Sequence, residues 1–210
     1  MRRYVYKLTT DDGGAPCVVD GLLSLAICKP MIRRTAKPGD LIFGFAANSL
    51  HRDNRLIYIA RVTEALPDGL YYRRRAYSGR RDRIYKWRSD GTFSLREDAQ
   101  FHAPERDHLR HDLGAFPDYE RADVLLSEDF RYFGPDCRVS LDTYPKLQSF
   151  VRKLGRGHGV KYSPELVIEL DKLQKSIWRY KNPDPVRSSQ QPSPRRSHRS
   201  RSCAVIDSRD

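Results

Sequence analysis

Two apolar runs constrain the fold of this chain most strongly. They are "LIFGFAA" at residues 41–47 and "RLIYIARVTE" at residues 55–64, with the short polar link "NSLHRDN" between them. Both runs are rich in β-branched and aromatic residues and have few polar positions, which is typical of strands that are buried on both faces. We therefore expect an antiparallel pair inside a covered sheet or barrel.

The residues around this pair predict how its ends are shaped. Lys37 to Asp40 fit a type II turn, with proline at the second position and a positive-φ glycine at the third. Gly44 inside the first run predicts a bulge or a close approach of another group. Asn48, Ser49 and His51 would then line the mouth of this β-unit.

The rest of the chain adds helices around a small sheet. Residues 4–10 alternate as in a strand, whereas the apolar run 22–28 fits either a strand or a helix. Pro30 opens a short helix, and Ser163 caps a long one with a stripe at Leu166, Leu170, Leu173 and Ile177. Further expected elements are a strand within residues 122–134 and a helix near residues 144–155, which Gly155 would end. We expect an α+β domain over residues 1–182, followed by a disordered Ser/Pro/Arg-rich tail over residues 183–210.

Charge indicates the class of partner. The net charge is +12, and +9 of it lies in residues 1–182, so the folded part is itself basic. Such an excess favours polyanions, although many basic proteins are only solvated this way. No signal peptide or spanning segment is evident, and the four cysteines lack metal-site spacing. We expect a cytoplasmic protein with reduced thiols, no membrane partner, no metal and no cofactor.

The segment 71–91 carries the strongest binding signal. Between Tyr71 and Arg88 it holds eight basic residues and one acidic residue, with five aromatic rings interleaved. Guanidinium groups pair with phosphates while flat rings stack on bases, which is what a nucleic-acid contact surface needs. The alternative is that the rings pack inward and the arginines form a solvated face.

Candidate catalytic groups are scattered. Cys17, Asp40 and His158 are available, but no known motif places two of them together, and Cys28 in its apolar run is expected to be inert. His102, His108 and His111 leave a metal site open, but surface histidines beside carboxylates are the preferred interpretation. The loop "RGHGV" at 156–160 fits either a phosphate or base contact or an ordinary connection. Spacing therefore favours a binding module over an enzyme.

The order of several segments resembles a known family. "YVYKLTTDDGGAP", "LLSLAICKPMIRRTAKPGDLIFGFA", "LIYIARVTE", "ADVLLSEDFRYFG" and "GRGHGV" together resemble the second type of nucleotide modification associated domain, a bacterial and phage family. The region "KPGDLIFGF…LIYIARVTE", residues 37–64, is also similar, more distantly, to the EVE and YTH members of the PUA-like superfamily. This resemblance implies a small PUA-like open β-barrel with covering helices, in a system that makes or handles modified DNA bases.

On this interpretation the chain would bind a modified base in nucleic acid, with DNA preferred, or a modified nucleotide. Nucleotide-modification enzymes are further expected partners. A base-modifying enzyme, or a non-catalytic subunit of a modification complex, is the alternative. The residues expected to contact the base are Phe45, Asn48, Ser49, Tyr85, Trp87 and His158. The residues expected to contact phosphates are Arg73, Arg74, Arg75, Arg80, Arg81, Arg83 and Arg156.

Overall fold

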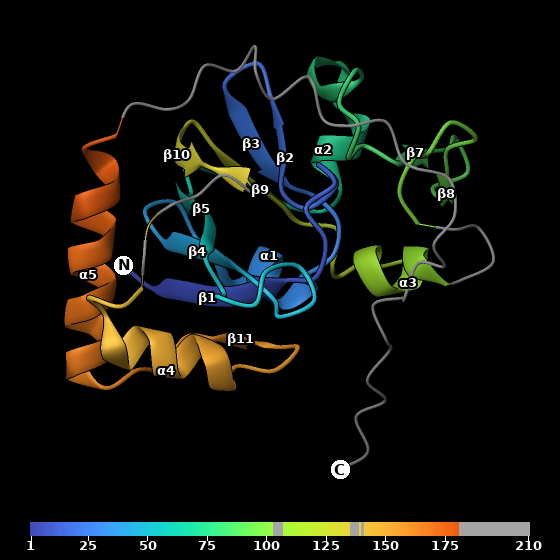
Figure 1. The fold of residues 1–210 in the computed structure, drawn as a ribbon. Coiled ribbons are helices and arrows are strands. Elements are labelled where there is room, and N and C mark those ends of the chain that lie inside the picture. Colours follow the sequence, from blue (N-terminus) through green and yellow to red (C-terminus); the bar gives the residue numbers. More distant parts are fainter. Residues whose placement is uncertain (103–106, 135–138, 140, 181–210) are drawn as a thin grey trace.

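A computed structural model describes residues 1–102, 107–134, 139 and 141–180 of the protein. Two packed sheets occupy its middle, with helices α4 and α5 on one side and the β7–β8 hairpin with α3 on the other (Figure 1). This is a mixed α/β architecture. The predicted tail, residues 183–210, lies outside the described residues.

The strands form three sheets. The order is β10-β5-β4-β1-β11 in the first, β2-β3-β9-β6 in the second and β7-β8 in the third. Only the β1–β4 pair is parallel among these pairings. The bounds are β1 Arg3–Leu8, β2 Cys17–Val19, β3 Leu22–Leu25, β4 Leu41–Ala46, β5 Leu56–Arg61, β6 Glu64–Leu66, β7 Tyr85–Trp87, β8 Phe93–Leu95, β9 Val124–Ser127, β10 Asp129–Tyr132 and β11 His158–Gly159.

The helices cover the outer faces and the ends of these sheets. Their bounds are α1 Pro30–Thr35, α2 Leu70–Arg73, the 3-10 turn η1 Arg75–Tyr77, α3 His108–Leu113, α4 Pro145–Lys153 and α5 Pro164–Trp178. The Ser163 side chain accepts the backbone N–H of Leu166 at 3.3 Å, so the predicted N-cap of α5 is confirmed. The chain leaves α4 at Leu154 in an extended conformation, so the predicted glycine cap at Gly155 is wrong.

The five-stranded sheet is buried on both faces, as the two apolar runs predicted. β4 and β5 pair antiparallel, and every residue of β4 is buried. One face packs against the buried stripe of α5, namely Leu166, Leu170, Leu173 and Ile177, together with Leu147 and Val151 of α4. The other face packs against β3 and β9 of the second sheet. Burial on both sides explains why the sequence pattern of these strands does not alternate.

Gly44 lies in β4 opposite Tyr58 of β5. The register of the pair shifts between Gly44 and Phe45, which confirms the predicted bulge. A Cβ atom on Gly44 would lie 2.2 Å from Tyr58 Cε1 and 2.8 Å from Leu8 Cδ1. The Tyr58 ring is fixed there because its hydroxyl shares a 2.9 Å hydrogen bond with the hydroxyl of Tyr6. Only glycine therefore fits without displacing core side chains.

A third core cluster supports the β7–β8 hairpin. Tyr71 and Tyr72 of α2 pack with Tyr85 of β7 and Phe93 of β8, and all four side chains are buried. The ring of Tyr72 meets the rings of Tyr85 and Phe93 edge to face, at a centroid distance of 5.7 Å in each case. Three of the five aromatic residues in segment 71–91, namely Tyr71, Tyr72 and Tyr85, are thus structural, which matches the inward-packing alternative for them.

The prediction of a PUA-like barrel is not confirmed. In the described part of the chain the sheets remain separate and none closes on itself. The run 22–28, which fitted either element type, contributes the short strand β3 and then leads into α1. None of the helices that the structure describes is both long enough and apolar enough to cross a membrane.

Candidate nucleotide-binding groove

The β7–β8 hairpin forms because its turn is locally stabilised. The backbone N–H of Arg88 donates to the Thr92 carbonyl at 2.8 Å, and Gly91 takes a positive φ of 82°. The Asp90 carboxylate accepts the backbone N–H of Thr92 at 2.9 Å and its hydroxyl at 2.6 Å. These contacts fix the conformation of the hairpin tip, and a hollow lies between the hairpin and α2.

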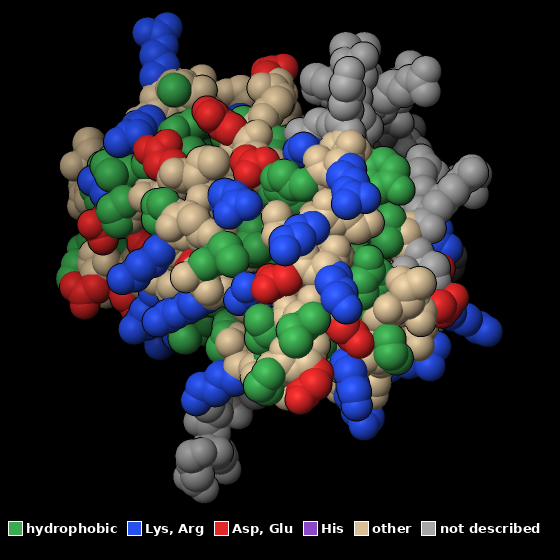
Figure 2. Space-filling model, turned by 90° about the vertical axis from the view of Figure 1, so that its left-hand side faces the viewer, with side chains coloured by type: hydrophobic (Ala, Val, Ile, Leu, Met, Phe, Trp, Pro, Cys, Tyr) green, Lys and Arg blue, Asp and Glu red, His purple; other side chains and the backbone are tan. Residues whose placement is uncertain are grey.

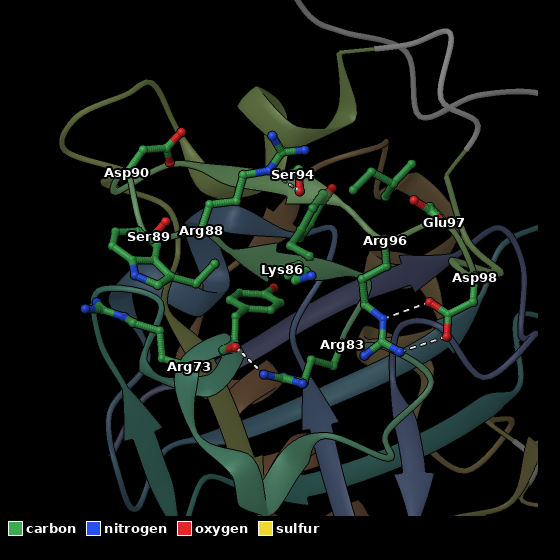
Figure 3. A pocket seen from close by; sticks show the side chains of 14 residues that line it. Arg73, Arg83, Lys86, Arg88, Ser89, Asp90, Ser94, Arg96, Glu97 and Asp98 are labelled. Atoms are coloured by element: carbon green, nitrogen blue, oxygen red, sulfur yellow. Dashed lines mark hydrogen bonds and ion pairs between the residues drawn. The ribbon is translucent and has the colours of Figure 1, made fainter.

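This hollow, called here the hairpin groove, has a volume of about 1220 Å³. It lies between α2 and the two strands, and the side chains of Arg73, Arg83, Lys86 and Arg96 surround it (Figure 3). Five cationic and three acidic side chains line it. The full lining is Tyr72, Arg73, Arg83, Tyr85, Lys86, Trp87, Arg88, Ser89, Asp90, Ser94, Leu95, Arg96, Glu97 and Asp98.

The cations of the groove differ in how far they are neutralised. Arg96 forms an ion pair with Asp98 at 2.7 Å, and Arg88 donates through Nε to the Ser94 hydroxyl at 3.0 Å. Lys86 is exposed, and its ammonium has no hydrogen bond or ion pair with any described residue. Lys86 and Arg88 therefore present charge to an incoming anion.

Arg83 lines the groove as a cation without a described carboxylate partner. Its guanidinium donates to the Tyr72 carbonyl, while its buried Nε has no hydrogen-bond partner among the residues that the structure describes. Burial, together with the nearby charge of Arg96, lowers the pKa of Arg83 below its ordinary value. A guanidinium in this state would be stabilised by a nearby anion, because the anion would offset both unfavourable effects.

Trp87 offers one aromatic surface at the groove. Its ring meets Phe93 edge to face at a centroid distance of 4.8 Å, which fixes it on the hairpin. The Arg73 guanidinium lies over this ring, 4.8 Å from its centroid, and also donates to the Asp68 carbonyl. Trp87 is half-buried, and the side chain that covers one face of its indole is the flexible Arg73 rather than a core residue.

The phosphate contact predicted for Arg80 is wrong. This side chain is 9% exposed, and its guanidinium donates to the carbonyls of Cys17, Val19 and Leu22. It also donates to the hydroxyls of Ser24 and Tyr71 and lies 3.7 Å from the buried Asp82. Arg80 therefore joins β2 and β3 to the segment after α2 and cannot reach a phosphate.

The base contacts predicted for Phe45 and Tyr85 are also wrong in the described conformation. Both side chains are 0% exposed. Phe45 points into the core that α4 and α5 cover. Tyr85 borders the groove, but its hydroxyl is turned inward and donates to the buried carboxylate of Asp112 at 2.9 Å.

The other predicted site residues are not gathered at one place. Asn48 and Ser49 are exposed on the loop after β4, and His158 lies half-buried on β11, with its ring 6.0 Å from that of Tyr4. Arg156 is exposed in the loop between α4 and β11. The structure does not bring these four residues to the hairpin groove.

The remaining predicted arginines surround α2 without lining the groove. Arg74 pairs with Glu64 at 3.4 Å, and Arg75 is exposed on η1. Arg81 donates to the Gln100 side chain, and its guanidinium lies over the Phe101 ring. On the opposite side of the molecule, the face of α4 and α5, Lys and Arg side chains alternate with acidic and uncharged ones and do not gather into a single patch (Figure 2).

Sequence reasoning missed three of the groove cations as site residues. Lys86 and Arg88 lie inside the basic aromatic segment that the sequence singled out, so their alternation with Tyr85 and Trp87 was the available signal. Arg96 lies on the partner side of the hairpin, and only the pairing of β7 with β8 places it there. Two residues considered for catalysis are structural instead. Cys17 is buried, which raises its pKa to about 12, and Asp40 accepts the backbone N–H groups of Arg2 and Lys37.

The fold and the groove define a mixed α/β protein with a cationic, aromatic-edged hollow. The family model of nucleotide modification associated domain 2 matches residues 1–191, which is most of the chain, and the protein belongs to that family. This confirms the resemblance drawn from the sequence. Neither the curated proteins nor the solved structures gave a match to this chain.

Proposed function

We propose that the hairpin groove binds a nucleic acid or nucleotide in a system that makes or handles modified bases. Membership of the nucleotide modification family supports involvement in such a system. The groove supplies the two kinds of contact that a nucleotide requires, cations for the phosphate and a flat ring for the base.

The observation that carries this proposal is the charge state around Arg83. Within the described residues its guanidinium lacks a carboxylate partner and its Nε lacks a hydrogen-bond partner, and burial together with the charge of Arg96 lowers its pKa. A phosphate placed between Arg83 and the exposed Lys86 would neutralise this local excess. Association with a polyanion is further favoured because each neutralised phosphate releases condensed counterions.

Trp87 gives the base contact in this proposal. Arginine side chains are flexible, so the Arg73 guanidinium can leave the indole and bind a flanking phosphate when a base stacks on the ring. Binding of one unstacked base beside its phosphates is consistent with a single-stranded or flipped substrate. The modified base itself would be read by polar groups at the groove edge, for which Ser89 and Ser94 are placed.

The experiment is salt-dependent binding to fluorescent single-stranded DNA, with and without modified bases, measured by anisotropy. We expect wild-type binding that weakens steeply with salt, and a Lys86→Glu variant with lower affinity and a salt slope reduced by roughly one. Lys172→Glu is the matched control, since Lys172 is exposed on α5 at the other side of the molecule. Equal losses in both variants would reject the groove as the binding site. A steep slope with no preference between modified and unmodified DNA would restrict the function to phosphate binding.

A further inference from the structure

Cys28, His102 and Asp112 come from three distant segments and meet beneath β7. Cys28 lies between β3 and α1, His102 follows β8, and Asp112 belongs to α3. The Cys28 Sγ is 3.6 Å from His102 Nε2, and the Asp112 Oδ2 is 3.1 Å from His102 Nδ1. One imidazole thus contacts both the thiol and the carboxylate, and one ligand atom of each of the three side chains lies within 4.8 Å of the other two.

The carboxylate of this cluster is fixed and ionised. Asp112 is fully buried, and its Oδ1 accepts the backbone N–H of Cys28 at 2.8 Å, while Oδ2 also accepts the Tyr85 hydroxyl. Burial alone would raise the pKa of Asp112. The hydrogen bond from His102 and the charge of Arg33 outweigh that effect and hold this pKa below its ordinary value.

A buried arginine links the backbone of Cys28 to the backbone of Asp112. Arg33 is 1% exposed, and it donates through Nε to the Cys28 carbonyl at 2.8 Å and through one terminal nitrogen to the Asp112 carbonyl at 2.6 Å. Cys28 itself takes a left-handed backbone conformation, with φ at 56°. Such a conformation is uncommon outside glycine, and it often marks functional residues held by surrounding contacts.

We propose that Cys28, His102 and Asp112 form a catalytic triad for acyl transfer. The order thiol, imidazole and carboxylate gives Cys28 the role of nucleophile and His102 that of general base, while Asp112 positions the imidazole. Cys28 as a residue is half-buried and the His102 side chain is 12% exposed, so the cluster lies close to the surface. The substrate class is an ester or amide carbonyl.

The chemistry needs only water as a second reactant. His102 takes the thiol proton, and the thiolate adds to the carbonyl carbon of the substrate. Collapse of the adduct breaks the bond to the alcohol or amine, which leaves with the proton from His102, and a thioester on Cys28 remains. Water, deprotonated by His102, then adds to the thioester carbon, releases the carboxylic acid and restores the thiol.

The same three side chains could also bind a metal ion, because one ligand atom of each lies within 4.8 Å of the other two. The triad and a metal centre are therefore competing assignments for one cluster, and the test below separates them. His108 stacks on His102, with ring centroids 4.2 Å apart and an interplanar angle of 23°, so its ring is parallel to that of His102 and does not converge on a shared point. The sequence-based interpretation of His102 as a surface histidine is wrong, because its side chain is only 12% exposed. The expectation that Cys28 is inert stays a prediction, which the experiment below tests.

Other titratable groups surround the thiol and must be considered in any pH experiment. Three buried tyrosines lie near Cys28, and burial raises the pKa of each, so they remain neutral near pH 7. Two cations come from the segment of Cys28 itself, and both would favour the thiolate. Besides His102 and Asp112, the groups are Tyr6 of β1, Tyr72 of α2, Tyr85 of β7, and Lys29 and Arg33 of the α1 region.

The test is alkylation of the intact protein by iodoacetamide, followed residue by residue with mass spectrometry. We expect the alkylation rate of Cys28 to reach half of its maximum at a pH below the ordinary thiol pKa of about 8.5. His102→Gln should slow alkylation of Cys28 at least about tenfold at pH 7. The buried Cys17 is the internal control and should react far more slowly. Asp112→Asn should move the pH profile upward, a shift that loss of stability alone does not produce.

Two results would overturn the proposal. One is equal alkylation rates in wild type and in a folded His102→Gln, or, if that variant does not fold, a wild-type profile centred at or above about 8.5. The other is stoichiometric zinc that copurifies and blocks alkylation until it is removed, since that would make these residues ligands. The acyl step itself is tested with 4-nitrophenyl acetate, which should acetylate Cys28 in wild type. A reactive Cys28 that is never acetylated would exclude acyl transfer.

Discussion

The Tyr85 hydroxyl donates a 2.9 Å hydrogen bond to the Asp112 carboxylate, while the same tyrosine borders the hairpin groove. One side chain therefore separates the proposed nucleotide site from the proposed triad. Tyr85→Phe should keep the ring and remove this bond together with the 3.3 Å contact between the hydroxyl and His102 Nδ1. The expected cost is about 1.5 to 3 kcal/mol in unfolding free energy, because the Asp112 acceptor is charged and buried. Urea denaturation checks this value. Tyr77→Phe is the control, since no hydrogen bond of the Tyr77 hydroxyl is found within the described residues; a loss of equal size in both variants would contradict the account.

Gly44 should tolerate no side chain. In Gly44→Ala the new methyl group would meet the Tyr58 ring and Leu8, and Tyr58 cannot move freely because it is bonded to Tyr6. Overpacking of this kind costs about 1 to 3 kcal/mol. The unfolding free energy should fall by that amount, whereas Gly155→Ala, which meets no atom within 4 Å, should change it by less than about 0.5 kcal/mol. An unaffected Gly44→Ala would show that the bulge is not needed for close packing.

His158 should make stability depend on pH in a defined direction. Burial, assisted by the charge of Lys29, lowers the pKa of His158 below its ordinary value of 6.5. The unfolded chain then binds a proton more readily than the folded one, so the folded state is disfavoured as pH falls below about 6.5 and regains stability above it. In His158→Gln this part of the pH dependence should disappear. Unfolding curves between pH 5 and 8 test it, and an identical pH profile in both proteins would contradict the assignment.

Trp87 should carry the base contact. Stacking on an aromatic side chain is worth about 1 to 3 kcal/mol per base, so Trp87→Ala should weaken binding to single-stranded DNA by roughly 5- to 150-fold. Trp178→Ala removes an indole at the end of α5, away from the groove, and provides the comparison. If the Trp178 variant loses as much affinity as the Trp87 variant, stacking in the groove is not the source of binding.

The sequence predicted what depends on local order along the chain. The β4–β5 pair, the bulge at Gly44 and the capped helix after Ser163 were all visible because neighbouring residues determine them. The fate of the arginines was not visible. Arg80 and Arg83 are three residues apart in the same basic run. The guanidinium of Arg80 is hydrogen-bonded to backbone carbonyls, whereas Arg83 lines the groove.

Contacts between distant segments explain the other misses. Cys28 and His102 lie 74 positions apart, and their meeting depends on how α1 and the segment after β8 pack around β7. No sequence motif relates two residues this far apart, so each could be interpreted from the sequence only by its own neighbours. The PUA-like open barrel is not confirmed for a similar reason, because strand pairs can be predicted locally, whereas the curvature that makes a barrel is a property of the complete sheet.

Photo-crosslinking tests the central claim most directly. Single-stranded DNA carrying 5-iodouracil would be bound to the full protein, irradiated, digested and analysed by mass spectrometry. The account predicts that crosslinked peptides fall within residues 83–98, with Trp87 as the preferred site, and that they decline as salt is raised. Crosslinks confined to other surfaces, such as the 48–54 loop or α5, with none in the hairpin groove, would contradict it.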